Sequence, residues 1–207
     1  MKSSHLLEVL VIVGFLLIGC AAEEGTCGPN LTWKSSNDET GVYVQLIING
    51  TGNMTDFCDG VVPWNIDNFK TRLYRVIIKE GVSSVGSCAF KDFSGLNIVS
   101  IPSTVSSIGK NAFSGCYSLI NLTIPDGVKS IGEGAFKKIG LESMTVPSSV
   151  EEIGTFAECS SLKNVDMYAN VSEVSSYAFE GCSSLESVIL PPTSHTFVHM
   201  LLATVLV

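Results

Sequence analysis

The positions of the histidines indicate whether this protein can use a histidine as a general base or to activate a nucleophile. The chain has three histidines: His5 near the amino terminus, and His195 and His199 near the carboxyl terminus. No Ser-His or Cys-His pair can therefore be assembled in the long central region. No Walker-type or G-x-G-x-x-G phosphate loop occurs. We expect the protein not to be an enzyme and to need no cofactor.

Carboxylates and basic residues do not point to chemistry either. Several glutamates fall at expected turn positions: Glu133, Glu151, Glu152, Glu158 and Glu180. The formal net charge is −8, which disfavours nucleic acid, because such a partner requires a basic face. Binding to another kind of partner is therefore the function class left open.

The central region, which must position any functional residue, is a repeat. Anchor leucines recur at intervals of 21 to 23 residues. Each anchor is the first residue of a repeat whose consensus is L-x-x-V-x-I-P-x-x-V-x-x-I-G-x-x-A-F-x-x-C-x-S-L. The anchors are Leu73, Leu96, Leu119, Leu141, Leu162 and Leu185. This pattern and period predict a leucine-rich repeat. Residues 73–192 are expected to form a mainly β solenoid of about five coils plus a partial sixth.

Each coil is expected to contain one short parallel strand and a return side of turns or short helix. Alternation in L-x-x-V-x-I places one apolar face inward, and Pro102, Pro125 and Pro147 end the strand. The Ala-Phe pairs should send one aromatic ring per coil into the core. Sharp corners at positive φ are predicted at Gly86, Gly109, Gly132 and Gly154. The fourth coil is two residues short after Gly154, which predicts a tightened return side.

Residues 23–72 do not follow the repeat. They include a strand-like run at residues 42–49, and a solenoid needs its first coil covered. We therefore predict a small β-rich N-terminal cap.

The motifs of this segment and of the repeat resemble those of one family. C-G-P-N-L-T-W at residues 27–33, G-T-G-N-M at 50–54, Pro63-Trp64 and the repeated A-F-x-x-C-x-S-L resemble the BspA-like leucine-rich-repeat surface proteins. The resemblance covers residues 27–192. It implies adhesion to, or recognition of, partner proteins and brings no catalytic residues. Members of the family often carry many more repeats.

The cysteines are expected to be structural. Cys27 and Cys58 both precede the repeats, and we predict a disulfide bond between them, which leaves Cys88 without an obvious partner. Cys116, Cys159 and Cys182 share one repeat position, where we expect small buried side chains; a Cys159–Cys182 disulfide is the alternative. No C-x-x-C pair occurs, so we predict no metal site.

Residues 1–22 have the features of a targeting segment. Lys2 precedes the apolar run Leu6–Ile18, and cleavage is expected after Ala21 or Ala22. The alternative is a bacterial lipoprotein signal, Leu-Ile-Gly-Cys, with a lipid on Cys20. Both interpretations predict a secreted or cell-surface protein, where disulfide bonds are permitted.

Glycosylation sequons distinguish these two interpretations. Asn-x-Ser/Thr occurs at Asn30, Asn49, Asn53, Asn121 and Asn170. As glycan sites they favour a eukaryotic secretory route. They are coincidental if the protein is a bacterial lipoprotein.

The carboxyl terminus, residues 193–207, leaves the repeat register and is apolar. We consider three interpretations: a cover over the last coil, a glycolipid-anchor signal, and a truncated gene end. A lipid or glycolipid anchor would be the only contact with a membrane.

Two surfaces are candidates for contact with a partner. Outward strand positions near the start of the repeats gather an unusual set of aromatic, basic and apolar side chains: Tyr74, Arg75, Ile77, Ile98 and Ile120. Exposed apolar clusters and Tyr or Arg anchors are typical of binding sites, so we predict a protein or a glycan-bearing surface as the ligand. The open last coil is the second surface, and it would support end-to-end self-association as a structural coat.

Overall fold

The computed structural model describes residues 23–38, 40–65, 69–169, 171 and 177–190. The predicted signal segment, Cys20, Asn170 and the tail at residues 193–207 lie outside these ranges. Within the described part, no helix is long and apolar enough to cross a membrane.

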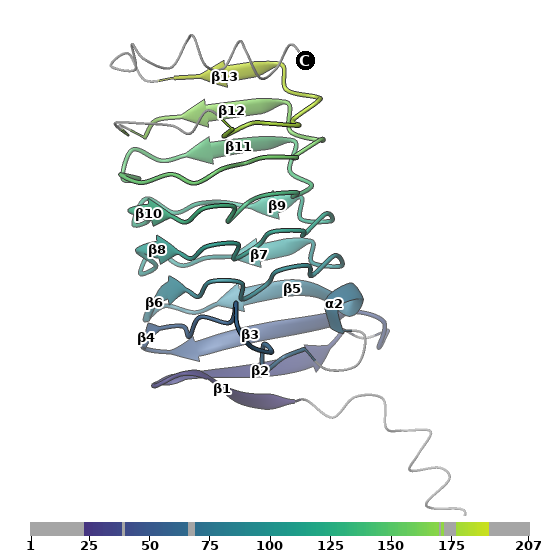
Figure 1. Ribbon diagram of the computed structural model, residues 1–207. Helices are drawn as coiled ribbons and strands as arrows, with labels where there is room; N and C mark the ends of the chain where they lie inside the picture. Colours follow the sequence, from purple (N-terminus) through teal and green to yellow (C-terminus); the bar gives the residue numbers. More distant parts are fainter. Residues whose placement is uncertain (1–22, 39, 66–68, 170, 172–176, 191–207) are drawn as a thin grey trace, which may run out of the picture.

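The chain forms a stack of coils whose strands run across the stack (Figure 1). A six-stranded sheet has the order β1 (Glu24–Gly28), β2 (Leu31–Asn37), β3 (Val44–Gly50), β5 (Leu73–Ile78), β7 (Ile98–Ser100) and β9 (Asn121–Leu122). A four-stranded sheet has the order β10 (Ser130–Ile131), β8 (Ser107–Ile108), β6 (Val82–Val85) and β4 (Gly52–Asn53). A three-stranded sheet contains β11 (Ser143–Val146), β12 (Asn164–Met167) and β13 (Ser187–Ile189). The fold is thus mainly β, and the described helix is the short α2 (Phe69–Arg72).

Apolar residues of the repeat form the core, as the pattern predicts. The anchors Leu73, Leu96 and Leu119 are fully buried, and β5, β7 and β9 pair in parallel. Pro147 directly follows the end of β11. The strand positions of the repeat are therefore confirmed, but β7 and β9 already end at Ser100 and Leu122, before Pro102 and Pro125.

The prediction of one strand per coil is wrong for the first coils. The V-x-x-I segments form a second parallel sheet, in which β6 pairs with β8 and β8 with β10. The backbone N–H of Ser106 donates to the carbonyl of Ser83 over 2.8 Å. Stacking places the V-x-x-I segment of one coil beside that of the next. The backbone N–H and C=O groups of these segments therefore form hydrogen bonds between coils. The described return side consists of turns.

The N-terminal segment is continuous with the repeats. β1 and β2 pair antiparallel, as do β2 and β3, while β3 runs parallel to β5. Trp33, Leu46 and Trp64 are buried in the same core as the repeat residues. Residues 23–72 therefore extend the first sheet, as well as packing against the first coil.

A ladder of aromatic rings runs through the core. Phe90, Phe113, Phe136, Phe156 and Phe179 stack with ring centroids 5.3 to 5.9 Å apart and planes within 8°. Trp64 continues the ladder at 5.3 Å from Phe90. Phe156 keeps its place although its coil is two residues short. The predicted aromatic ring of each coil is thus confirmed.

The repeat glycines do not have the predicted positive φ. Left-handed residues lie elsewhere on the return side, among them Cys88, Asn111 and Lys138. A Cβ at Gly109 would instead lie 2.5 Å from the backbone N of Ser87 in the preceding coil. Glycine is needed because neighbouring backbones approach too closely for a side chain.

Gly109→Ala is therefore expected to lower the free energy of unfolding by about 1–3 kcal/mol, because two backbones must move apart. Gly60→Ala is the matched control: nothing lies within 4 Å of its added Cβ, and we expect a change within about 0.5 kcal/mol. Equilibrium urea denaturation compares the two. Equal stability of the variants would contradict the close-approach explanation.

The predicted Cys27–Cys58 disulfide is wrong. The structure joins Cys58 to Cys88, with Cα atoms 5.0 Å apart, and leaves Cys27 as a free buried thiol. Cys27 lies at an inward position of β1, whereas exposed Cys58 follows β4 beside the first coil. The disulfide thus links the N-terminal segment to the repeats.

The repeated cysteines are buried and free, as expected. Each Sγ donates to a carbonyl about one coil away: Cys116 to Phe90, Cys159 to Phe136 and Cys182 to Phe156, at 3.0 to 3.1 Å. Burial raises the pKa of Cys116, and the neighbouring Cys182 thiol, followed by burial, raises that of Cys159. The neighbouring Cys159 thiol lowers the pKa of Cys182, but that side chain is buried as well. All three thiols therefore fill the core.

Native thiols should therefore resist alkylation. Burial raises the pKa of Cys27 to about 11, so only about one in a thousand Cys27 side chains is a thiolate at pH 8. We expect iodoacetamide to label Cys27 and Cys116 only after denaturation, as read by peptide mass spectrometry. Equal labelling rates in native and denatured protein would contradict their burial.

Candidate binding face

The outer face of the six-stranded sheet combines side chains from the N-terminal segment and from the repeats. Register places Lys34, Ile47, Ile77 and Ser100 in one row across β2, β3, β5 and β7. A parallel row holds Ser36, Gln45, Arg75, Ile98 and Asn121. We call these rows, with Thr32, Asn49 and Lys79 beyond them, the outer face.

The residues predicted to bind a partner lie on or beside the outer face. Arg75 pairs in register with Ile98, and Ile77 lies two residues further along the same strand. Ile120 immediately precedes β9 and is 60% exposed. Tyr74 falls at a register irregularity between β3 and β5. The structure brings these side chains onto adjacent strands or directly beside them. Their role in binding stays a prediction.

The contribution of the N-terminal strands to this face was not predicted from the sequence. Tyr43 lies beside Tyr74, with ring centroids 5.1 Å apart, and Ile47 is in register with Ile77. The alternating run at residues 42–49 indicates a strand, but nothing in it specifies β5 as the partner. Pairing of β3 with β5 is what doubles the width of the face.

A small depression surrounds the tyrosine pair. It has a volume of about 290 Å³ and is lined by Ser36, Asn37, Asp38, Tyr43, Val44, Gln45, Tyr74 and Arg75. The Arg72 guanidinium donates to the carbonyls of Gly41 and Val42, at 2.8 and 3.2 Å. The loop that carries Tyr43 is therefore held in place from the side of α2.

Asp38 holds the same loop from within. Its carboxylate accepts hydrogen bonds from the Thr40 hydroxyl and from the backbone N–H of Tyr43, at 2.8 and 3.2 Å. Desolvation acts to raise the pKa of Asp38, but these hydrogen bonds outweigh it and hold that pKa below its usual value. The Asp38 carboxylate is thus occupied by its own loop.

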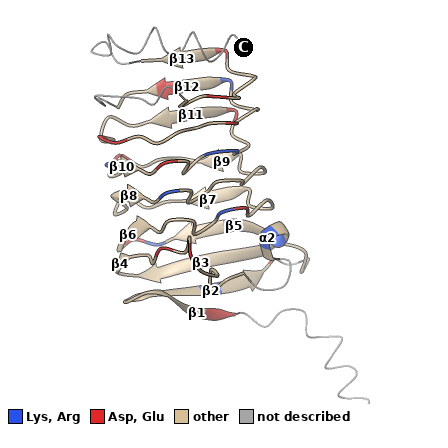
Figure 2. Cartoon of the chain, viewed as in Figure 1, with Lys and Arg blue, Asp and Glu red and all other residues tan. Residues whose placement is uncertain are grey.

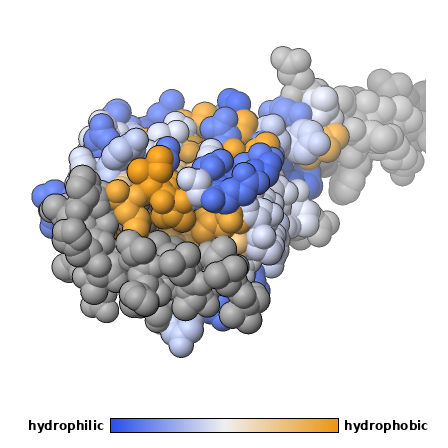
Figure 3. All heavy atoms as spheres, turned by 90° about the horizontal axis from the view of Figure 1, so that it is seen from above, coloured by the Kyte–Doolittle hydropathy of each residue, from blue (hydrophilic) through white to orange (hydrophobic). Residues whose placement is uncertain are grey.

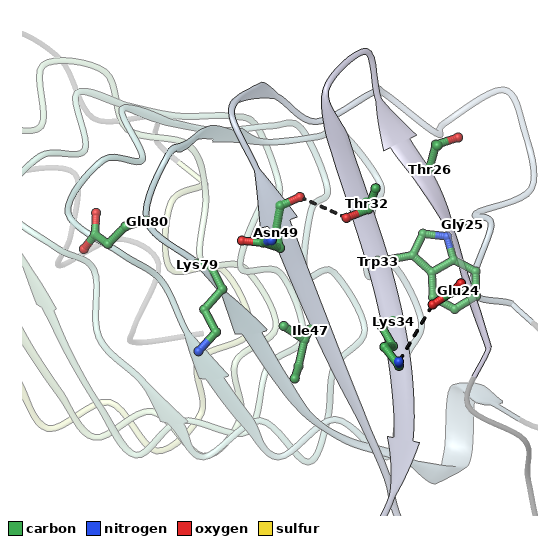
Figure 4. A pocket seen from close by; sticks show the side chains of 10 residues that line it. All are labelled: Glu24, Gly25, Thr26, Thr32, Trp33, Lys34, Ile47, Asn49, Lys79 and Glu80. Carbon is green, nitrogen blue, oxygen red and sulfur yellow. Dashed lines mark hydrogen bonds and ion pairs between the residues drawn. The ribbon is translucent and has the colours of Figure 1, made fainter.

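A larger depression lies at the other end of β3 (Figure 4), with a volume of about 840 Å³. Its lining residues are Glu24, Gly25, Thr26, Thr32, Trp33, Lys34, Ile47, Asn49, Lys79 and Glu80. Lys34 lies 3.8 Å from Glu24, and the Thr32 hydroxyl donates to the Asn49 carbonyl over 3.4 Å. The two negative and two positive side-chain charges of this depression therefore sum to zero.

Charges are distributed over the whole stack, mostly in connections between strands (Figure 2). On the later coils they pair, as in Lys110–Glu133 at 2.6 Å and Lys163–Glu142 at 2.8 Å. Within the described ranges, Arg75 and Lys79 have no such ion pair. Their polar groups on the outer face are available to a ligand.

Among the described residues, no group of three or more His, Cys, Asp or Glu side chains could hold a metal ion. Of the predicted glycosylation sites, Asn30, Asn49, Asn53 and Asn121 are exposed. Asn121 and Asn49 belong to the outer face, so a glycan on either would cover part of it.

Stacked parallel strands, a leucine-anchored core and an ordered outer face define a leucine-rich-repeat protein. The chain belongs to the BspA type leucine-rich-repeat family, whose model matches residues 68–186 in six copies. No curated protein matches the chain.

Solved structures of bacterial proteins share this fold. A leucine-rich repeat protein from Bacteroides ovatus is 29% identical, with a TM-score of 0.57, over 79% of this chain and 46% of that one. The T. pallidum leucine-rich repeat protein is 24% identical, with a TM-score of 0.57, over 77% and 80%. The pneumococcal vaccine antigen PcpA is 23% identical, with a TM-score of 0.52, over 60% and 33%. The chain thus spans less than half of the B. ovatus protein.

Proposed function

We propose that this protein is a secreted or cell-surface recognition protein that binds a partner through its outer face. One observation carries the proposal: Ile47 and Ile77 form a row on the outer face, directly beside the row that contains Arg75 and Ile98. Both depressions lie along these rows. Partly exposed apolar side chains gathered beside Tyr and Arg are typical of contact surfaces.

The family supports the same class of function. BspA type proteins are generally surface or protein-interaction proteins, and the family is typically non-enzymatic. We further propose that the coils form one solenoid, that residues 23–72 cap it, and that residues 1–22 direct export. The exposed sequons and the Cys58–Cys88 disulfide fit an exported protein.

The double variant Tyr74→Ala/Ile98→Asp tests the proposal. The wild-type chain is first screened against an array of purified surface ectodomains, and each hit is titrated by biolayer interferometry. We expect the double variant to bind at least about 30-fold more weakly, because two central contacts of a small interface are removed.

Tyr117→Ala provides the control, since Tyr117 is 60% exposed and lies outside the outer face. It should bind like the wild type. If the double variant kept full affinity for every hit, the outer face would not be the binding surface.

Self-association is a second candidate, and one feature favours it. β13 is the last strand of the three-stranded sheet; Ile189 is 53% exposed, and Val188 and Leu190 are only partly buried. Viewed from the end of the stack where β13 lies, the surface formed by the described residues has apolar side chains near its centre (Figure 3). Such an edge can pair with a second copy.

Sedimentation velocity over a hundredfold concentration range tests this second candidate. Self-association predicts a mass that rises with concentration and a rise that Ile189→Lys abolishes. A constant monomer mass would eliminate it and leave partner binding as the function.

A further inference from the structure

We infer that the partner bound at the outer face is a neutral oligosaccharide, and that Tyr43 is the platform on which one sugar ring stacks. This inference rests on the proposed function and specifies the chemical class of its ligand. It is carried by the tyrosine pair, the polar lining of both depressions and their charge balance.

The Tyr43 ring is exposed and yet held in place. It is 48% exposed, while hydrogen bonds from Arg72 and to Asp38 hold the loop around it. The backbone N–H of Asp38 also donates to the Tyr43 carbonyl over 2.9 Å. A rigid exposed aromatic ring loses little entropy on binding, and its apolar face suits the C–H face of a pyranose.

The groups around the tyrosines suit sugar hydroxyls. The Gln45 amide can both donate and accept, and the Arg75 guanidinium offers a planar set of donors to neighbouring hydroxyls. Asn37 and Ser36 add further amide and hydroxyl groups. A depression of about 290 Å³ is small for a protein element, and pockets of this size take small ligands.

The larger depression extends the site along the strands. Six residue steps separate Tyr43 from Asn49, so the two ends lie about 20 Å apart along β3. Thr32, Asn49 and Lys79 line the far end together with Glu80. Several linked sugar rings fit this length, with hydroxyl, amide and charged groups along their path.

The charge balance favours a neutral ligand. Among the described lining residues, Glu24 and Glu80 offset Lys34 and Lys79 in the larger depression, and Asp38 accompanies Arg75 in the smaller one. A polyanion or an acidic peptide would meet as many repulsive as attractive charges. Neutral hydroxyls accept from the bases and donate to Glu24 and Glu80 without that conflict.

A glycan microarray that contains neutral, sialylated and sulfated oligosaccharides tests the inference with the full chain. We expect binding to neutral structures. For the best of them, titration should show a loss of about tenfold or more in Tyr43→Ala and a smaller loss in Gln45→Ala, because an anchoring contact is removed. Tyr43→Phe should retain affinity, since stacking needs the ring and not the hydroxyl. Tyr117→Ala is the matched control and should bind normally.

Three results would overturn the inference. They are no binding to any glycan, binding only to charged glycans, and neutral-glycan binding that Tyr43→Ala leaves unchanged. If an ectodomain hit keeps its affinity after enzymatic removal of its glycans but loses it to Tyr74→Ala/Ile98→Asp, the proposed function stands and the oligosaccharide inference is wrong.

Discussion

Phe113→Ala is expected to lower the free energy of unfolding by about 3–5 kcal/mol, because it leaves a cavity in a fully packed core. Phe113 is completely buried and stacks on Phe90 at 5.3 Å and on Phe136 at 5.8 Å. Guanidinium denaturation followed by tryptophan fluorescence measures the loss. In thermal unfolding the midpoint should fall by about 10 °C for a chain of this size.

Two further variants show whether the loss comes from the stacked ring. Phe113→Leu keeps most of the buried volume and should cost far less than alanine. Tyr117→Ala removes an exposed ring from the same coil and should change stability by no more than about 0.5 kcal/mol. A loss below about 1 kcal/mol for Phe113→Ala would show that the ladder does not hold neighbouring coils together.

Removal of the Cys58–Cys88 disulfide is expected to cost about 3–4 kcal/mol, because the bond restricts an unfolded loop. The two cysteines are 30 residues apart, and the loop between them contains β5 and joins the N-terminal segment to the first coil. The double variant Cys58→Ala/Cys88→Ala should therefore denature at a lower guanidinium concentration than the oxidised wild type.

Reduction provides an independent route to the same state. Wild-type protein treated with dithiothreitol should denature like the double variant, and dithiothreitol should not affect the double variant further. Identical midpoints for oxidised and reduced wild type would mean that the bond contributes nothing to stability.

The repeat made most of the core predictable. Leucine anchors and Ala-Phe pairs recur at a fixed period, and a side chain such as Leu119 or Phe136 can be buried in every coil only if the coils stack. The strand position was predictable for the same reason, since alternation in L-x-x-V-x-I separates inward from outward side chains. Both features follow from a local pattern that repeats at a fixed period.

Long-range features were not predictable from one sequence. The position of Cys88 opposite Cys58 depends on how the loop after β4 meets the first coil. The function of Gly109 depends on the backbone of Ser87, which lies 22 residues earlier and 2.5 Å from an added Cβ. A glycine in a turn suggests positive φ, whereas close approach between coils becomes visible only in three dimensions.

The candidate site was predicted in its repeat half only. Arg75, Ile77 and Ile98 follow from the strand register, but Tyr43 and Ile47 join them through the parallel pairing of β3 with β5. Parallel pairing across a long connection has no local sequence signal, because the turn does not set the register. The width of the outer face is therefore a result of the structure.

Isoleucine methyl NMR on a complex with a confirmed ligand tests the outer face most directly. Ile47, Ile77 and Ile98 carry methyl groups on this face, whereas Ile189 lies on β13, at the far end of the stack. We predict chemical-shift changes at the first three and none at Ile189. Changes at Ile189 with unaltered Ile47, Ile77 and Ile98 signals would contradict the account and place the contact at the end of the stack.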